Sequence, residues 1–449
     1  MSKRAKSTSR TIKKRLVTLS LLLLTALVLG WTWRKTRTEP GLKPLVSHAL
    51  ATSPAPCAIA LTAHSGSLTI DEKISRLQQE TRISGDPASK LEQLGWLFIK
   101  KARLSYDPGY YKLAEECAAC IDSQKNGSPE ALLLRAHALQ SLHQFSAAEP
   151  LARKLVSLRG LAFDYGVLGD VLVDEGKTQE AVDAYQKMVD LRPDLQSYTR
   201  AAHVRWLKGN LHGAIELMKL AASSGSPADP ESAAWAFSRL SLYQLQAGDT
   251  KSALRACDAA LNFQSDYAPA LLARGRILLA QHKTGEAINA LSRAATLNPL
   301  PEYLWNLADA LRANGNVDAA RLAENEILQR GAANDPRTLA LFLATRGEQS
   351  ETAVRLSEQE LRVRLDAFTH DAFAWSLAAA GQTKEARDQM NKALAEGTKD
   401  ARLFFHAGVI SWMSGQKQEA RRWLNQAYSF RQMLLPSEKE QLSKYVAKS

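Results

Sequence analysis

The sequence lacks the local motifs by which many enzymes are recognised. It contains no glycine-rich phosphate-binding loop, no Gly-x-Ser-x-Gly nucleophile motif, no glycine-rich dinucleotide-binding turn and no His-Glu-x-x-His pair. Its nine histidines are scattered along the chain, without a spacing that groups metal ligands. We therefore predict no catalytic residue, no metal site and no cofactor.

Cysteine is scarce, because the 449 residues include only four. Four cysteines are too few for a fold that depends on disulfides. Cys117 and Cys120 have the CxxC spacing of redox and metal sites, but they lie in an apolar pattern of helical spacing and no second CxxC follows. We interpret them as two small core residues one helical turn apart, with a disulfide or a redox role as the alternative. Cys257 has the position of a packing residue.

An excess of charge of one sign is absent beyond the N-terminus. The formal net charge is +12, from 58 Lys and Arg against 46 Asp and Glu. Residues 1–37 hold ten of the basic residues and none of the acidic ones, so the remaining chain carries 48 basic residues against 46 acidic ones. Because a nearly neutral chain offers no extended basic surface, we predict that it does not bind nucleic acid.

Long apolar runs are absent, with one exception. Leu16–Trp33 is an uncharged run of 18 residues, which is about the length that crosses a bilayer. Seven basic residues precede the run and four follow it closely. This asymmetry predicts an uncleaved transmembrane signal anchor with a cytoplasmic N-terminus and the rest of the chain across the membrane. A cleaved signal peptide and a buried helix are the alternatives; the small-residue site at Ala49–Ala51 lies far beyond the run.

What the sequence does contain is a repeat with a period near 34 residues. A hexapeptide that begins with Gly and ends with Ala occurs at Gly176–Ala181, Gly209–Ala214, Gly248–Ala253, Gly315–Ala320, Gly381–Ala386 and Gly415–Ala420. Weaker versions place Ala148, Ala287 and Ala353 in the same role. This period predicts a solenoid of helical hairpins. In each hairpin Gly, which tolerates positive φ, ends the first helix, and Ala lets the second helix pack closely.

Each unit resembles the tetratricopeptide repeat. In the unit that begins near Ala162, the residues that carry the resemblance are Tyr165, Leu168, Gly169, Leu172, Ala181, Tyr185 and Pro193. The unit with Gly275, Ala287 and Pro299 repeats the pattern, whereas other units replace the first-helix Gly with Ala or Ser. The resemblance implies an all-α fold, a right-handed superhelical solenoid of about nine to ten helix pairs, preceded by the transmembrane helix.

Several phrases of the chain resemble one group of membrane-anchored bacterial tetratricopeptide proteins. They are YDPGYYKLAE from Tyr106, VDLRPDLQSY from Val189, FTHDAFAWSLAAAG from Phe368 and GTKDARLFFHAG from Gly397. That group has no settled biochemical activity. The resemblance therefore implies a scaffold and names no reaction.

The chain divides by composition into six parts. Pro, Ala, Ser and Thr dominate after the apolar run, which is typical of a flexible tether, and helical spacing resumes near residue 68. The predicted parts are a basic cytoplasmic N-terminus (1–15), a transmembrane signal anchor (16–33), a tether (34–67), an N-terminal capping helix (68–89), the solenoid (90–430) and a C-terminal capping helix (431–449).

A concave groove is the predicted binding site. In tetratricopeptide solenoids the first helices line the concave side, and aromatic and Arg side chains dominate binding hot spots. The first-helix positions that carry such residues here are His203, Trp206, Arg239, Arg276, Trp305, Arg312, Phe368, Trp375, Arg402, Phe405 and Trp412. For each ring the alternative is a place in the core between repeats.

The sequence as a whole predicts a non-enzymatic scaffold or adaptor in the bacterial inner membrane. Its solenoid is expected on the periplasmic or extracytoplasmic side, where it binds a protein or peptide partner. One alternative is an accessory or regulatory subunit of a membrane enzyme complex, in envelope polysaccharide or cytochrome biogenesis. Another is a secreted soluble repeat protein. Self-association is left open.

Overall fold

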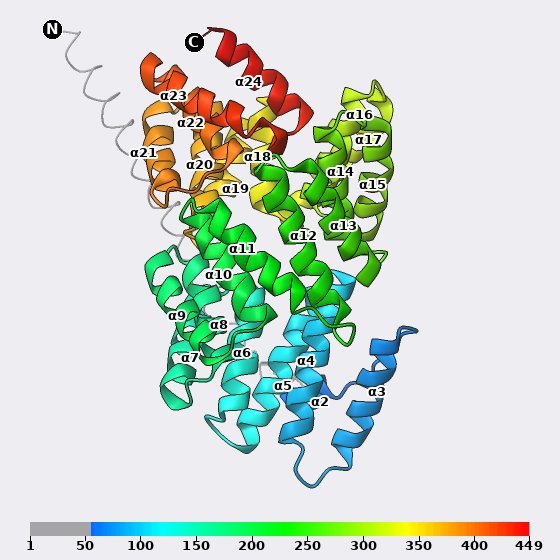
Figure 1. Cartoon of the computed structure of the whole chain (residues 1–449). Helices are drawn as coiled ribbons and strands as arrows, with labels where there is room; N and C mark the ends of the chain where they lie inside the picture. Colours follow the sequence, from blue (N-terminus) through cyan, green and yellow to red (C-terminus); the bar gives the residue numbers. More distant parts are fainter. Residues whose placement is uncertain (1–54, 449) are drawn as a thin grey trace, which may run out of the picture. The chain divides into compact units, whose positions relative to one another are not determined.

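All regular secondary structure in the computed structural model is helical. The structure describes residues 55–448, which form 23 α-helices, one short 3-10 helix and no strand (Figure 1). Helices α2 (Pro56–Ala60) and α3 (Thr69–Arg82) precede the repeats. The all-α prediction is confirmed.

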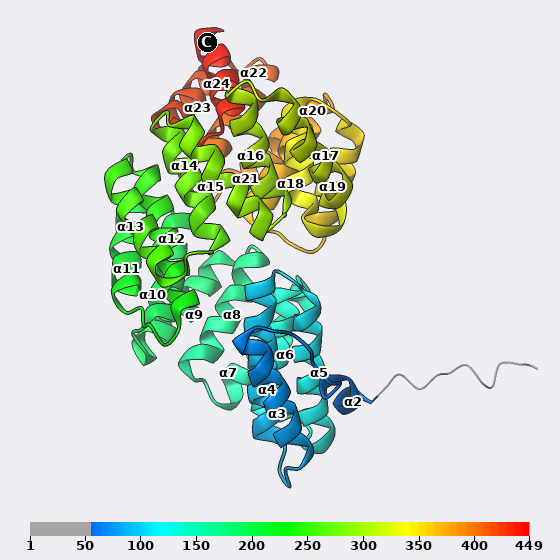
Figure 2. The ribbon, with the colours of Figure 1, turned by 90° about the vertical axis from the view of Figure 1, so that its right-hand side faces the viewer.

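Helices α4 to α23 form ten consecutive hairpins. The first helices are α4 (Ala88–Ser105), α6 (Pro129–Ser141), α8 (Ala162–Asp174), α10 (Leu195–Leu207), α12 (Pro230–Gln246), α14 (Ala268–Ala280), α16 (Pro301–Ala313), α18 (Pro336–Arg346), α20 (Ala367–Ala379) and α22 (Ala401–Met413). The second helices are α5 (Gly109–Gln124), α7 (Phe145–Leu158), α9 (Thr178–Leu191), α11 (Leu211–Ser223), α13 (Thr250–Phe263), α15 (Thr284–Leu297), α17 (Val317–Asn334), α19 (Ser350–Leu361), α21 (Thr383–Leu394) and α23 (Lys417–Ser429). Each first helix packs against its own second helix and against the next first helix, so the first helices form one continuous row (Figure 2).

The repeated hexapeptide builds the hairpin turn as the sequence predicts. All six of its glycines have positive φ, between 71° and 83°. All nine repeat alanines are 0% exposed, because the second helix lies directly against the first at that point. The first-helix Gly allows an equally close approach, since a Cβ on Gly169 would lie 2.2 Å from the Tyr185 ring.

A disulfide attaches the first described helix to the solenoid. Cys57 of α2 is bonded to Cys120 of α5, and the two helices pack together. Cys120 therefore forms a disulfide, but its partner is Cys57 and not Cys117 of the CxxC pair, and the interpretation of Cys120 as only a small core residue is corrected. Cys117 is free and buried, and burial raises the pKa of its thiol. Residues 56–60, placed in the predicted tether, are helical and docked on the first hairpin.

Three predicted segments lie wholly or mostly outside the described residues. These are the basic N-terminus (1–15), the transmembrane anchor (16–33) and the tether (34–67) as far as residue 54. Among the helices between residues 55 and 448, none is both long and apolar enough to cross a membrane.

The solenoid closes on itself, because two corners of its C-terminal half dock on the N-terminal half. In the corner after α19, the Leu365 amide donates a hydrogen bond to the Asp174 carbonyl at the end of α8, at 2.9 Å. In the corner before α22, the Thr398 hydroxyl donates to the Leu207 carbonyl at 2.7 Å. The Lys208 ammonium lies 2.6 Å from the Glu396 carboxylate. These contacts join residues about 190 positions apart in the chain.

The C-terminal residues fill part of the inner surface. The 3-10 helix η1 (Arg431–Met433) contacts α12, α14 and α22, and the Arg276 guanidinium donates to the Met433 carbonyl at 2.8 Å. Helix α24 (Pro436–Lys448) packs on α23, as expected of a cap, and also on α16 (Figure 2). The Glu438 side chain is fully buried and lies 2.6 Å from Arg402. The C-terminal cap therefore also bridges first helices that are separated in sequence.

Matched glycine substitutions should show that closure stabilises the fold. Gly176→Ala and Gly381→Ala both place a Cβ at positive φ, which costs about 1 to 2 kcal/mol. Only at Gly176 does the new Cβ also lie 2.6 Å from the Leu365 carbonyl oxygen, whereas nothing lies within 4 Å at Gly381. We expect Gly176→Ala to lower the urea midpoint clearly more than Gly381→Ala. Equal midpoints would mean that the corner at Leu365 is not docked in solution.

Candidate functional site

Two cavities lie against the row of first helices. The larger, of about 940 Å³, is lined by α4, α6, α8, α10 and α12, and we call it the open groove. The smaller, of about 330 Å³, is lined by first helices from α10 to α22 together with Met433 and Leu435, and we call it the inner cavity. Two C-terminal residues, Met433 and Leu435, therefore line the inner cavity, whereas no residue between Met433 and Lys448 lines the open groove.

One end of the open groove is aromatic. Trp96 of α4, His137 of α6 and Phe163 of α8 lie with ring centroids 5.4 to 6.0 Å apart, and we call them the aromatic cluster. Trp96 and Phe163 are half-buried, so part of each ring faces the groove. Burial lowers the pKa of His137 to about 4, and the ring is therefore neutral near pH 7. This cluster can accept an apolar or aromatic group.

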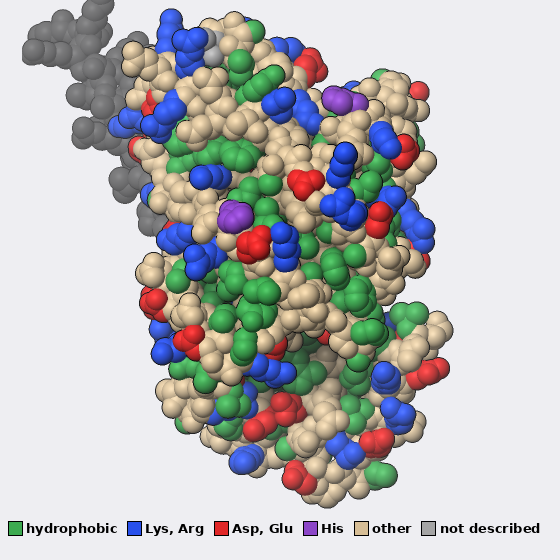
Figure 3. Space-filling model, in the orientation of Figure 1, with side chains coloured by type: hydrophobic (Ala, Val, Ile, Leu, Met, Phe, Trp, Pro, Cys, Tyr) green, Lys and Arg blue, Asp and Glu red, His purple; other side chains and the backbone are tan. Residues whose placement is uncertain are grey.

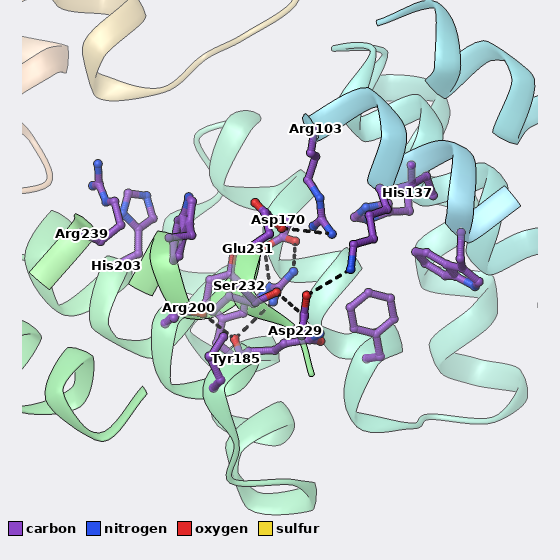
Figure 4. A pocket seen from close by; sticks show the side chains of 18 of the residues that line it. Arg103, His137, Asp170, Tyr185, Arg200, His203, Asp229, Glu231, Ser232 and Arg239 are labelled. Atoms are coloured by element: carbon purple, nitrogen blue, oxygen red, sulfur yellow. Dashed lines mark hydrogen bonds and ion pairs between the residues drawn. The ribbon is translucent and has the colours of Figure 1, made fainter. Parts of the chain in front are cut away.

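In the middle of the groove, the Asp170 carboxylate already accepts hydrogen bonds from neighbouring side chains. The Arg200 guanidinium donates two hydrogen bonds to Asp170, at 2.8 and 2.6 Å, and the Tyr185 hydroxyl donates a third at 2.8 Å (Figure 4). These short charge-assisted bonds join α8, α9 and α10. Asp170 therefore has a structural role, because it holds α8, α9 and α10 together where they line the groove.

Two longer ion pairs cross the groove from α4 to α12. Lys100 lies 3.5 Å from Asp229, and Arg103 lies 3.5 Å from Glu231 (Figure 4). Both distances exceed the 2.7 to 2.9 Å of a strong charge-assisted hydrogen bond. The Glu231 Oε2 atom is buried and accepts no hydrogen bond from the described residues. The two pairs join hairpins that are four repeats apart and limit the width of the groove.

The other end of the groove carries Arg239 and His203. Figure 4 shows Arg239 beside His203, apart from the network of dashed interactions. The Arg239 guanidinium lies 5.4 Å from the Tyr243 ring centroid. Burial, and next the charge of Arg239, lower the pKa of His203 to about 4. At neutral pH His203 is uncharged, and the positive charge of Arg239 dominates this end.

The structure divides the eleven predicted groove residues among three places. His203 and Arg239 line both cavities. The residues that line the inner cavity alone are Trp206, Arg276, Trp305, Phe368 and Arg402. The residues that line neither cavity are Arg312, Trp375, Phe405 and Trp412.

Several of these side chains have packing roles in the closed solenoid. Trp206 and Phe368 stack face to face across the closure, with centroids 5.5 Å apart and an interplanar angle of 8°. Trp375 stacks on His406 at 4.1 Å. Phe405 is fully buried, and Arg312 lies 2.6 Å from Glu324 of the second helix of its own hairpin.

Sequence reasoning missed the aromatic cluster and Trp235. Trp235 is 37% exposed and lines the groove four residues before Arg239, which places both on one face of α12. That spacing was readable from the sequence. Trp96 lies in a hairpin that precedes the first clear hexapeptide, so its position could not be counted from a landmark. Between residues 55 and 448, no group of three or more His, Cys, Asp and Glu is placed to hold a metal ion.

Comparison with known proteins identifies the repeat. Models of the tetratricopeptide repeat match residues 165–195, 272–336 and 372–432. The chain is a tetratricopeptide-repeat protein. Its repeats beyond the matched residues continue the same row of hairpins. No curated protein matches the sequence.

Three solved structures are similar to parts of the chain at low identity. A tetratricopeptide repeat protein from Parabacteroides merdae ATCC 43184 is 19% identical over 56% of this chain and 98% of that one, with a TM-score of 0.32. YrrB, described as having an unusual peptide-binding site, is 17% identical over 45% and 99%, with a TM-score of 0.32. Yeast Tom70 is 13% identical over 84% and 92%, with a TM-score of 0.36.

Proposed function

We propose that this protein is a non-enzymatic, membrane-anchored scaffold that holds a segment of a protein partner in the open groove. The observation that carries the proposal is that, within residues 55–448, none of the C-terminal residues lines the open groove, whereas Met433 and Leu435 line the inner cavity. Tetratricopeptide repeats in general supply surfaces for binding proteins and peptides.

The lining of the groove has the composition of a protein-binding surface. Aromatic rings from α4, α8 and α12 face it beside Lys and Arg side chains, and such residues dominate interface hot spots. Its volume of about 940 Å³ is at the upper end of ligand pockets, which suits several residues of a peptide. On the face drawn in Figure 3, Lys and Arg are interspersed with Asp and Glu, which does not favour a nucleic-acid partner.

The anchor and compartment are also part of the proposal. The run Leu16–Trp33, with more basic residues before it than after it, supports a signal anchor of the bacterial inner membrane with the solenoid on the periplasmic side. The disulfide between Cys57 and Cys120 supports the same side, because disulfides persist in oxidising compartments.

A site-specific photo-crosslinker tests the groove. We expect benzoylphenylalanine in place of Trp235 to form a discrete adduct with one partner in intact cells, because this ring is exposed in the groove. The matched control replaces Tyr428, which is 45% exposed and lies outside both cavities. Phe163→Ala should reduce the Trp235 adduct. Adducts of equal yield at both positions, or none at Trp235, would contradict a groove-binding scaffold.

The reactivity of the cysteines toward an alkylating reagent tests in which compartment the solenoid lies. Cells are quenched with acid, and the denatured protein is then alkylated with and without prior reduction. We expect only Cys117 and Cys257 to react without reduction, and all four cysteines after it. A chain lacking residues 1–33 should stay in the cytoplasm and react at all four from the start. Full reactivity of the native chain without reduction would place the solenoid in a reducing compartment.

A further inference from the structure

We infer that the partner segment carries an acidic side chain that binds Arg239 and the Tyr243 hydroxyl, and an aromatic or large aliphatic side chain that binds the aromatic cluster. This inference deepens the proposed function and rests on it. It assigns to the open groove two subsites of different chemistry, one at each end.

Among the described residues, Arg239 is the one cation lining the open groove that has no carboxylate partner. Five Lys and Arg side chains line the groove against three Asp and Glu. Four of the five form an ion pair with a carboxylate. The pairs are Lys100 with Asp229 at 3.5 Å, Arg103 with Glu231 at 3.5 Å, Arg192 with Asp194 at 2.9 Å and Arg200 with Asp170 at 2.6 Å. Arg239 has neither a carboxylate partner nor a hydrogen bond among the described residues.

Tyr243 supplies a second, independent observation at the same place. Its side chain is 2% exposed, and its buried hydroxyl has no hydrogen-bond partner within residues 55–448. A buried hydroxyl without a partner is unfavourable, because it has lost its hydrogen bonds to water and gained none in the protein. Tyr243 follows Arg239 by one helical turn and lines the same cavities. A bound carboxylate could accept hydrogen bonds from both groups, which would satisfy the hydroxyl and neutralise the guanidinium.

The surroundings favour an anion over a cation at this end. The His203 ring beside Arg239 is neutral at pH 7, because burial and the charge of Arg239 lower its pKa to about 4. The three carboxylates that line the groove, Asp170, Asp229 and Glu231, each already lie near a Lys or Arg. A cation that entered this end would be repelled by the Arg239 guanidinium. A carboxylate would be attracted to it and could accept its hydrogen bonds.

The aromatic cluster is the second subsite. Its rings come from three successive first helices, α4, α6 and α8, whereas Arg239 is on α12. The Arg200 guanidinium covers Phe163 from one side, at 5.9 Å from the ring centroid. The faces of Trp96 and Phe163 that remain accessible can pack edge to face with an incoming ring. Because the two subsites lie on different hairpins, an extended segment is the ligand that can reach both.

Blocked synthetic peptides test the two subsites on the full chain in detergent micelles. The probes are N-acetylated, C-amidated peptides with one Phe and one Glu, separated by one to six Gly or Ser residues, and matched peptides with Gln for Glu. We expect the best Glu peptide to bind about tenfold more tightly than its Gln partner, as for a charge-assisted hydrogen bond. Arg239→Gln should reduce this ratio to about one, and Phe163→Ala should weaken both peptides equally. Fluorescence anisotropy measures the affinities of both peptides for the native chain and for each variant.

Arg431→Gln is the matched control variant. Arg431 lies over the Tyr428 ring at 4.2 Å, in the same kind of Arg–Tyr pair, and lines neither cavity. The Arg431→Gln variant should leave the ratio of the Glu-peptide affinity to the Gln-peptide affinity unchanged. The NMR titration of His203 gives a direct readout, because a carboxylate at Arg239 should raise the His203 pKa above about 4. Circular dichroism of Arg239→Gln checks that the variant is folded.

The outcomes separate this inference from the proposed function. Peptide binding that depends on Phe163 but is indifferent to Glu and to Arg239 would overturn the acidic subsite and leave the scaffold proposal standing. The Gln peptides are also tested with a free C-terminus. Binding of these peptides through Arg239, with no effect of Glu in the amidated ones, would overturn recognition of a side chain in favour of a terminal carboxylate. Failure of every peptide, together with no adduct at Trp235, would overturn both proposals.

Discussion

The hydrogen bond from the Leu365 amide to the Asp174 carbonyl marks the constraint on which the rest of this structure depends. Through this corner and the one at Thr398, the C-terminal hairpins dock on the N-terminal ones. Closure places the first helices of both halves face to face, where Trp206 stacks on Phe368. The inner surface is therefore shared between the halves and is no longer one continuous groove.

Closure explains why the two cavities differ. Met433 and Leu435, from the C-terminal part of the chain, line the inner cavity. Arg276 donates a hydrogen bond to the Met433 carbonyl there. The open groove is not lined by these C-terminal residues, and it keeps half-buried rings and, among the described residues, an Arg without a carboxylate partner. A solenoid can build a binding surface anywhere along its row of helices, and here the chain's own packing leaves the larger of the two cavities in the N-terminal half.

The hairpins were predictable from the sequence because their determinants are local. Gly at the turn and Ala in the second helix lie five residues apart, and the structure confirms both roles in every hexapeptide. The places of His203 and Arg239 on first helices could also be counted from such landmarks, and both line the open groove. The Cys57–Cys120 disulfide spans 63 residues, and the Trp206–Phe368 stack depends on the superhelical path of many repeats. No local pattern encodes either contact, and so the division of the groove was not predictable.

Amide hydrogen exchange at Leu365, resolved to single residues, tests the closed solenoid most directly. Leu365 lies in a corner between helices with its side chain 48% exposed, and its amide is protected only by the carbonyl of Asp174 in the other half of the chain. The account predicts that this amide exchanges slowly in the full native chain, at a rate close to that of neighbouring helical amides. Fast exchange at Leu365, with slow exchange in α19 and α20, would show an open solenoid and would contradict the division of its inner surface.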